Sequence, residues 1–261
     1  MGFAPTASEP KKQSCMLRTF STSIIFIFCL SFGLFAQQED KYNDLLILYV
    51  DGDYEKLIRK AEKYTEKSDT RRDAEPFLYL SKAYFEMSRL EEFRDEYPKA
   101  FRDALKYASK YRRKDKELEY WDLHKDFFVE LRSEAMREAD IHLEDRDPRG
   151  LSQAARIYKS LVDIDPDDAG AALMYGATLY TINRRGEADM LMREWSPKLG
   201  SVSVDRMDDD QKEMFKFGLM FYAEYLKDDG RSDSARATMA IGYPFFKDDN
   251  EFKIVYDQVQ R

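Results

Sequence analysis

Cysteine and histidine are scarce in this sequence. Its two cysteines, Cys15 and Cys29, both lie within the first 36 residues, so the rest can form no disulfide and offers no thiol nucleophile or thiolate metal ligand. The two histidines, His124 and His142, fall in a segment whose pattern predicts one long helix. At about 1.5 Å per residue they would lie about 27 Å apart, too far to share a metal ion. We expect surface or interhelix histidines, with no metal site and no cofactor.

Glycine and proline are also infrequent, with 11 and 8 residues among 261. Neither of the glycine-rich phosphate-binding patterns, G-x-G-x-x-G or G-x-x-x-x-G-K-[ST], occurs, and there is no G-x-S-x-G nucleophile elbow. Alternation typical of a strand is confined to one short stretch, SVSVD at residues 201–205. Apolar residues elsewhere recur at spacings of three and four, which indicates amphipathic helices. The predicted fold class is therefore all-α.

Acidic residues outnumber basic ones, 50 to 42, and the net charge is −8. The first 36 residues hold three basic residues and one acidic residue, so the remainder carries −10. A negative surface repels nucleic acid and anionic membrane surfaces, which argues against either as the main partner. The chain is nevertheless too apolar, at 43% hydrophobic residues, to be a disordered acidic protein.

The first 36 residues differ in composition from the rest. Three basic residues precede a mostly apolar run from Ser23 to Phe35, and Ala36 and polar residues follow. This order is typical of a signal peptide, and the run is short for a membrane-spanning helix. We expect residues 1–36 to be a signal peptide, with Met16 as an alternative start, and residues 37–261 to be the exported chain. An uncleaved segment acting as an anchor is the alternative.

The stretch from residue 153 to 195 contains a pattern that nearly repeats. One small and two large apolar residues share a helical face, and they recur about 34 positions later. The two sets are Ala154, Tyr158, Leu161 and Ala188, Met192, Trp195. Between them, Pro166 is expected to begin a new helix, Gly176 to allow close helix packing, and Arg185-Gly186 to end that helix.

This pattern resembles the tetratricopeptide repeat (TPR), a helix-turn-helix unit that stacks into a solenoid. Looser matches occur at residues 52–64, 76–87, 98–108 and 213–226. The resemblance implies a TPR-like solenoid of about five irregular repeats, with insertions near residues 90–97, 201–208 and 228. The long helical pattern from Asp115 to Glu144 and the residues Ala172 and Arg185 depart from the family.

In this family, particular positions of each first helix line a concave groove. Carried onto the matching positions here, the resemblance implies a groove for protein or peptide partners. Its residues would be Glu75, Leu78, Lys82, Phe85, Glu86, Leu173, Tyr180, Thr181, Lys212, Phe215, Leu219 and Tyr222. Aromatic rings beside charges suit such partners. Leu78 stands where members that bind acidic C-terminal tails have a lysine.

Three charged segments invite other interpretations. DIDPDDAG, residues 163–170, places Asp at alternate positions as a calcium loop does, but it lacks the required Gly and Glu, so we expect a turn and helix cap. DRMDDD, residues 205–210, is likewise expected to be a loop with a helix N-cap. KYASKYRRKDK, residues 106–116, is either a solvated helix end or a docking patch for an acidic partner or an envelope polysaccharide.

These features favour a non-enzymatic scaffold exported to the periplasm or outer envelope of a Gram-negative-type bacterium. It would bind envelope proteins or peptide segments, within a secretion or motility assembly by analogy. A carbohydrate- or peptidoglycan-binding protein is the alternative, followed by a hydrolase that uses an acidic pair. The last helical pattern, EFKIVYDQV at residues 251–259, would either cap the array or mediate self-association.

Overall fold

The computed structural model describes residues 1–2, 41–118, 121–144 and 147–261. The chain divides into two units, Met1–Asn43 and Asp44–Arg261. Apart from Met1 and Gly2, the predicted signal segment lies outside the described residues.

The described residues form eleven α-helices and no strand, which confirms the all-α prediction for that part of the chain. The helices are α2 (Asn43–Val50), α3 (Tyr54–Glu66), α4 (Glu75–Arg89), α5 (Ala100–Lys114), α6 (Lys125–Glu144), α7 (Pro148–Ile164), α8 (Ala169–Thr181), α9 (Arg185–Trp195), α10 (Asp209–Asp228), α11 (Ser232–Phe246) and α12 (Asn250–Gln260). The segment SVSVD, the one strand candidate, instead lies between and within two 3₁₀ turns, Leu199–Ser201 and Val204–Arg206.

Short turns with one left-handed residue join three pairs of helices. Gly52 has a φ of 74° between α2 and α3, Asn183 has 61° between α8 and α9, and Gly230 has 79° between α10 and α11. Glycine and asparagine adopt this conformation at low cost, so they end a helix and allow the next to turn back. The predicted break at Arg185-Gly186 is therefore wrong by two residues, because both belong to α9.

Aspartates begin four of the helices. The side chains of Asp147, Asp168, Asp208 and Asp249 accept hydrogen bonds from backbone N–H groups in the first turns of α7, α8, α10 and α12. Asp208 and Gln211 form a reciprocal capping box, with Gln211 N donating to Asp208 at 2.9 Å. The two acidic stretches thus supply helix caps, as the sequence predicts.

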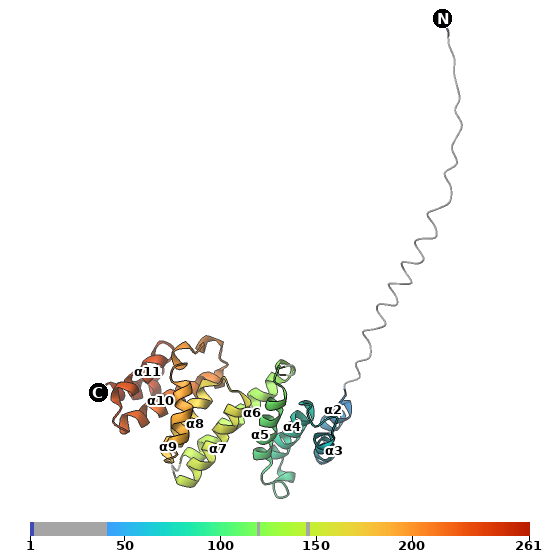
Figure 1. Ribbon diagram of the computed structural model, residues 1–261, viewed down its shortest axis with the longest axis horizontal. Helices are drawn as coiled ribbons and strands as arrows, with labels where there is room; N and C mark the ends of the chain where they lie inside the picture. The colour runs from blue at the N-terminus through green and yellow to red at the C-terminus, as the bar shows by residue number, and fades with distance from the viewer. Residues whose placement is uncertain (3–40, 119–120, 145–146) are drawn as a thin grey trace. The chain divides into compact units, whose positions relative to one another are not determined.

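Helices adjacent in sequence pack against each other along most of the unit (Figure 1). Four such packed pairs are α4 with α5, α6 with α7, α8 with α9, and α10 with α11. Successive pairs are joined by contacts of α5 with α7, α7 with α8, and α8 with α10. The terminal helix α12 packs on α10 and α11, so within this chain it closes the last pair.

Two clusters of buried apolar side chains hold these helices together. The C-terminal core includes Leu173, Trp195 and Phe215, and the N-terminal core includes Tyr111 and Leu131. Four partly buried side chains pack against both cores, and these are Val162, Tyr175, Phe217 and Phe221. The two cores therefore meet at α7, α8 and α10.

Glycines allow close packing around α8. A Cβ placed on Gly170 would lie 2.6 Å from the backbone nitrogen of Phe215, and one on Gly218 would lie 2.7 Å from Leu173 Cβ. A Cβ on Gly176 would lie 2.6 Å from the sulfur of Met192 in α9. The close contact expected at Gly176 is therefore present, and Gly218, within the looser match at residues 213–226, makes another.

Two segments differ from the sequence-based expectation. The segment from Asp115 to Glu144 does not form one helix. Asp115 lies at the C-terminal end of α5, where its side chain accepts a hydrogen bond from Tyr111 Oη at 2.6 Å. A 3₁₀ turn at Asp122–His124 then precedes α6. The insertion expected near residue 228 extends α10 to 20 residues, and only a short turn separates it from α11.

Candidate functional site

The structure places most of the predicted groove residues in its cores. Seven of the twelve are at most 6% exposed. They are Leu78, Phe85, Leu173, Tyr180, Phe215, Leu219 and Tyr222. In this arrangement these side chains stabilise the fold, and they present little surface to a partner.

Close helix packing explains this burial. Helices α8 and α10 approach each other at Gly170 and Gly218, so Leu173 and Phe215 are enclosed between them. Leu219 lies beneath Gly242 of α11 and Phe252 of α12, and it is fully buried. A repeat pattern in the sequence predicts which residues share one face of a helix. It does not predict which neighbouring helix covers that face.

The remaining five predicted residues are partly or fully exposed: Glu75, Lys82, Glu86, Thr181 and Lys212. Three of these belong to α4, where the carboxylates of Glu75 and Glu86 act on Lys82. Thr181 lies at the end of α8 and borders a groove described below. Lys212 lies in the first turns of α10, 3.8 Å from Asp209.

Lys82 lies among aromatic rings and a histidine. Its Nζ is 3.3 Å from His124 Nδ1 and 5.6 Å from the ring centroids of both Tyr49 and Phe127. Burial lowers the pKa of Lys82, whereas Glu75 and Glu86 oppose this change. Burial, together with the positive charge of Lys82, lowers the pKa of His124 to about 4. The lysine thus links α2, α4 and the start of α6.

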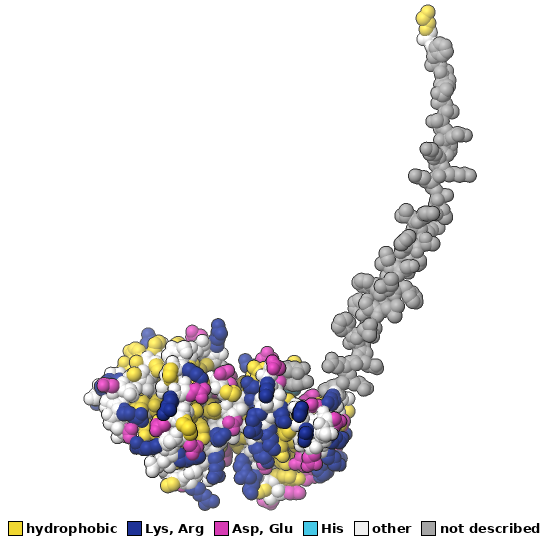
Figure 2. Space-filling view, in the orientation of Figure 1, with side chains coloured by type: hydrophobic (Ala, Val, Ile, Leu, Met, Phe, Trp, Pro, Cys, Tyr) yellow, Lys and Arg dark blue, Asp and Glu magenta, His cyan; other side chains and the backbone are white. Residues whose placement is uncertain are grey.

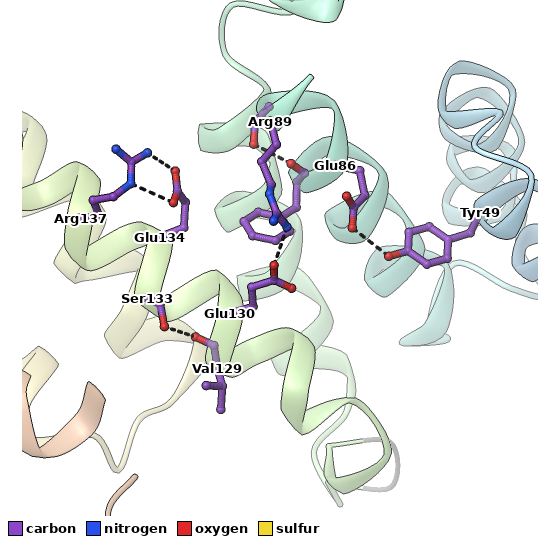
Figure 3. A network of polar contacts seen from close by, with 10 residues as sticks. Tyr49, Glu86, Arg89, Val129, Glu130, Ser133, Glu134 and Arg137 are labelled. Carbon is purple, nitrogen blue, oxygen red and sulfur yellow. Dashed lines mark hydrogen bonds and ion pairs between the residues drawn. The ribbon is translucent and has the colours of Figure 1, made fainter. Parts of the chain in front are cut away.

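Polar contacts across the same helices are shown in Figure 3. Tyr49 of α2 donates a hydrogen bond to Glu86 of α4 at 3.0 Å, and Arg89 of α4 pairs with Glu130 of α6 at 2.5 Å. Burial and the charge of Glu86 raise the pKa of Tyr49. In this cluster the basic side chains of Lys82 and Arg89 are each close to carboxylates, so the cluster is largely balanced in charge. We regard it as a junction between helices.

A second candidate binding site, more open to solvent than the cluster around Lys82, is a groove in the C-terminal half. We call it the acidic-rimmed groove. It has a volume of about 470 Å³, and α6, α7, α8, α10 and α12 line it. Its apolar residues are Leu143, Leu151, Met174, Phe217, Met220, Phe221, Ile254 and Val255, and its polar ones are Asp140, Thr181, Glu224 and Glu251.

All the charged side chains that line this groove are acidic. Loss of solvation raises the pKa of Asp140, and the nearby carboxylates Glu144 and Glu213 raise it further. A cation placed near Asp140 would reduce that repulsion. The groove therefore combines an apolar floor with a rim that attracts positive charge.

Such a surface suits binding of an apolar segment flanked by cations. Phe217 and Phe221 provide ring surface at a low cost in side-chain entropy, and Ile254 is 59% exposed beside them. Of the sequence-predicted residues only Thr181 belongs to the groove. The groove residues on α6 and α12 were missed because those helices fall outside the repeat matches. Those on α8 and α10, such as Met174 and Phe217, lie within matches but at positions that the repeat does not assign to its groove.

No group of three or more His, Cys, Asp or Glu side chains in the described part is arranged to hold a metal ion. Among the helices that the structure describes, none is both long and apolar enough to cross a membrane. Comparison of the chain with protein-family models, with curated proteins and with solved structures finds no match.

Proposed function

We propose that this protein is a non-enzymatic scaffold that binds a segment of a partner protein in the acidic-rimmed groove. One observation carries the proposal: five helices converge on a groove of about 470 Å³ with an apolar floor and carboxylates at its rim. Grooves of this kind accept amphipathic helices, whose apolar residues recur at three- and four-residue spacing.

The charge of the rim narrows the choice of partner. Asp140, Glu224 and Glu251 border the groove, and no Lys or Arg is among its lining residues. A partner helix with lysine or arginine beside its apolar face would complement these carboxylates, whereas an acidic helix would be repelled. The preferred occupant is therefore a basic amphipathic segment.

A TPR-like solenoid remains our proposal for the organisation of the helices. The packed pairs α4–α5, α6–α7, α8–α9 and α10–α11 support it, as does the close contact between Gly176 and Met192. The 20-residue helices α6 and α10 are longer than the other described helices and make the array irregular.

Export is a separate part of the proposal and rests on the composition of residues 1–36. We propose that this segment directs the chain to the periplasm or outer envelope of a Gram-negative-type bacterium, where its partners would be envelope proteins. Fractionation of cells producing the tagged protein tests this. Recovery of full-length, unprocessed protein in the cytosol would overturn export but leave the groove proposal intact.

Selection from a random peptide library tests the groove directly. We expect the enriched peptides to carry apolar residues at helical spacing with Lys or Arg beside them. Ile254→Glu should weaken their binding at least about tenfold, because it places a charge at the exposed apolar edge of the groove next to acidic groups. Isothermal titration calorimetry of a selected peptide gives the affinities.

Met190→Glu is the matched control. Met190 is 66% exposed on α9 and lies outside the groove, so the same apolar-to-acidic change should leave peptide affinity unchanged. Equal binding by wild type and Ile254→Glu would reject the groove as the binding site. Retention on a glycan array that Ile254→Glu abolishes would assign the groove to carbohydrate instead.

A further inference from the structure

Basic side chains surround a hollow in the N-terminal half of the unit. Its cations are Arg71, Arg72, Lys110, Arg113, Lys114 and Lys116. The hollow has a volume of about 880 Å³, and Thr65 and Phe77 complete its lining. We call this surface the basic hollow. Figure 2 shows Lys and Arg side chains in dark blue where Figure 1 places α5.

Two segments bring these cations together. Lys110, Arg113 and Lys114 lie three and four residues apart in the last turns of α5, so they share one helical face. The turn after α3 supplies Arg71 and Arg72. Lys114 links the two segments, because its Nζ lies 3.2 Å from the backbone oxygen of Arg71 and 5.7 Å from the Phe77 ring centroid.

The cations of the basic hollow lack ion-pair partners within the described part of the chain. None of the six cations forms an ion pair with a described carboxylate, although many other Lys and Arg residues do. Partial burial and the neighbouring cations Lys106 and Arg113 lower the pKa of Lys110, whereas the carboxylates of Asp103 and Glu62 oppose this change. Unpaired positive charge in a chain of net charge −8 marks a site where a bound anion would relieve repulsion.

We propose that the basic hollow binds a short acidic segment of a protein. Three of its six cations are arginines, whose guanidinium groups bind carboxylates through two parallel hydrogen bonds. The hollow is open to solvent and lined by eight residues from two segments, so several side chains of a bound segment can enter it.

The net charge of the chain favours a short segment over a long polyanion. A nucleic acid or an anionic membrane would extend well past the hollow, and a chain with a net charge of −8 repels a long polyanion. A peptide with a few clustered carboxylates can place its charges within the hollow alone. This site is separate from the acidic-rimmed groove, and its partner has the opposite charge.

Fluorescence anisotropy of a labelled Glu-rich peptide tests the proposal, with the Gln-substituted peptide as a control. We expect the Glu peptide alone to bind, and its binding to weaken as salt rises from about 50 to about 300 mM. Arg71→Glu with Arg113→Glu should weaken binding at least about tenfold. Both side chains are exposed, so the helices should be retained, which circular dichroism checks.

Arg193→Glu with Lys247→Glu is the matched control, since it makes the same change in net charge at exposed positions of α9 and the end of α11. This variant should bind like wild type. Equal weakening by both double variants would overturn the proposal, because the effect would then come from net charge. Tighter binding of inorganic polyphosphate or anionic phosphatidylglycerol vesicles than of the Glu peptide would also overturn it.

Discussion

The Asp168 carboxylate caps a helix and is also buried, and these two features have opposite effects on its charged form. It caps α8 by accepting a hydrogen bond from Ala171 N at 3.0 Å, yet it is only 3% exposed. Burial raises its pKa to about 6, and the neighbouring Asp165 adds to this, while Arg132 and the capping hydrogen bonds act in the other direction. The cap is therefore favourable in position but unfavourable as a fully charged group.

Asp168→Asn should change how stability depends on pH. Because the pKa of Asp168 is raised on folding, its contribution to the free energy of unfolding is fully present below pH 4 and is lost as pH rises through about 6. Asparagine caps helices equally well and does not ionise. Relative to the variant, the wild type should lose on the order of 2 kcal/mol between pH 4 and pH 7.

Urea denaturation of both proteins at several pH values measures this difference. Asp167→Asn, at the exposed neighbouring position, controls for the change in net charge. If the free energies of unfolding of wild type and Asp168→Asn ran parallel from pH 4 to pH 7, the proposed ionisation of Asp168 would be ruled out.

Glycine matters at the scale of helices where α8 meets α10. Gly170 lies against the backbone of Phe215, which cannot move aside as a flexible side chain can. Gly186 also lies in the first turn of a helix, α9, but a Cβ there would meet no atom within 4 Å. Substitutions at the two positions therefore distinguish the effect of helix propensity on stability from the effect of helix packing.

Gly170→Ala should lower the free energy of unfolding by about 2 to 3 kcal/mol, because the added methyl group forces α8 and α10 apart. Gly186→Ala should instead raise it by up to about 1 kcal/mol, since alanine favours the helix. Thermal and urea denaturation of both variants measure the two effects. Destabilisation of similar size in both would show that packing at Gly170 is not the cause.

The sequence predicted elements better than the surfaces they form. Helical periodicity, helix caps within residues 163–170 and 205–210, and the small residue Gly176 were apparent, because each depends on near neighbours in the chain. The acidic-rimmed groove was not apparent from the sequence, because it brings together residues that lie far apart in the chain, from Asp140 to Val255. Which helix covers which face depends on such distant contacts, and one sequence does not contain them in readable form.

At the scale of the whole unit, the two cores are joined by shared side chains. Tyr175 of α8 and Phe217 and Phe221 of α10 pack against both clusters. A unit connected in this way should unfold in one step, whereas an array of weakly coupled repeats can unfold from one end.

The two tryptophans allow each core to be followed separately. Trp195 belongs to the C-terminal core, and Trp121 packs against the N-terminal core, 4.4 Å from the Phe128 ring by centroids. Trp121→Phe and Trp195→Phe therefore each leave one fluorescent reporter. In each variant the fluorescence and far-UV circular dichroism transitions in urea should coincide. A separate fluorescence transition in either variant would show that the cores unfold independently.

The position of Phe217 and Phe221 also bears on how this protein can change over evolutionary time. These rings line the acidic-rimmed groove and pack against both cores, so mutations that reshape the groove floor would be selected against for their effect on folding. Glu251 and Ile254 are exposed at its edge on α12 and are not members of either core. Homologous proteins should therefore acquire new partners chiefly through substitutions on α12, while the residues of the groove floor change slowly.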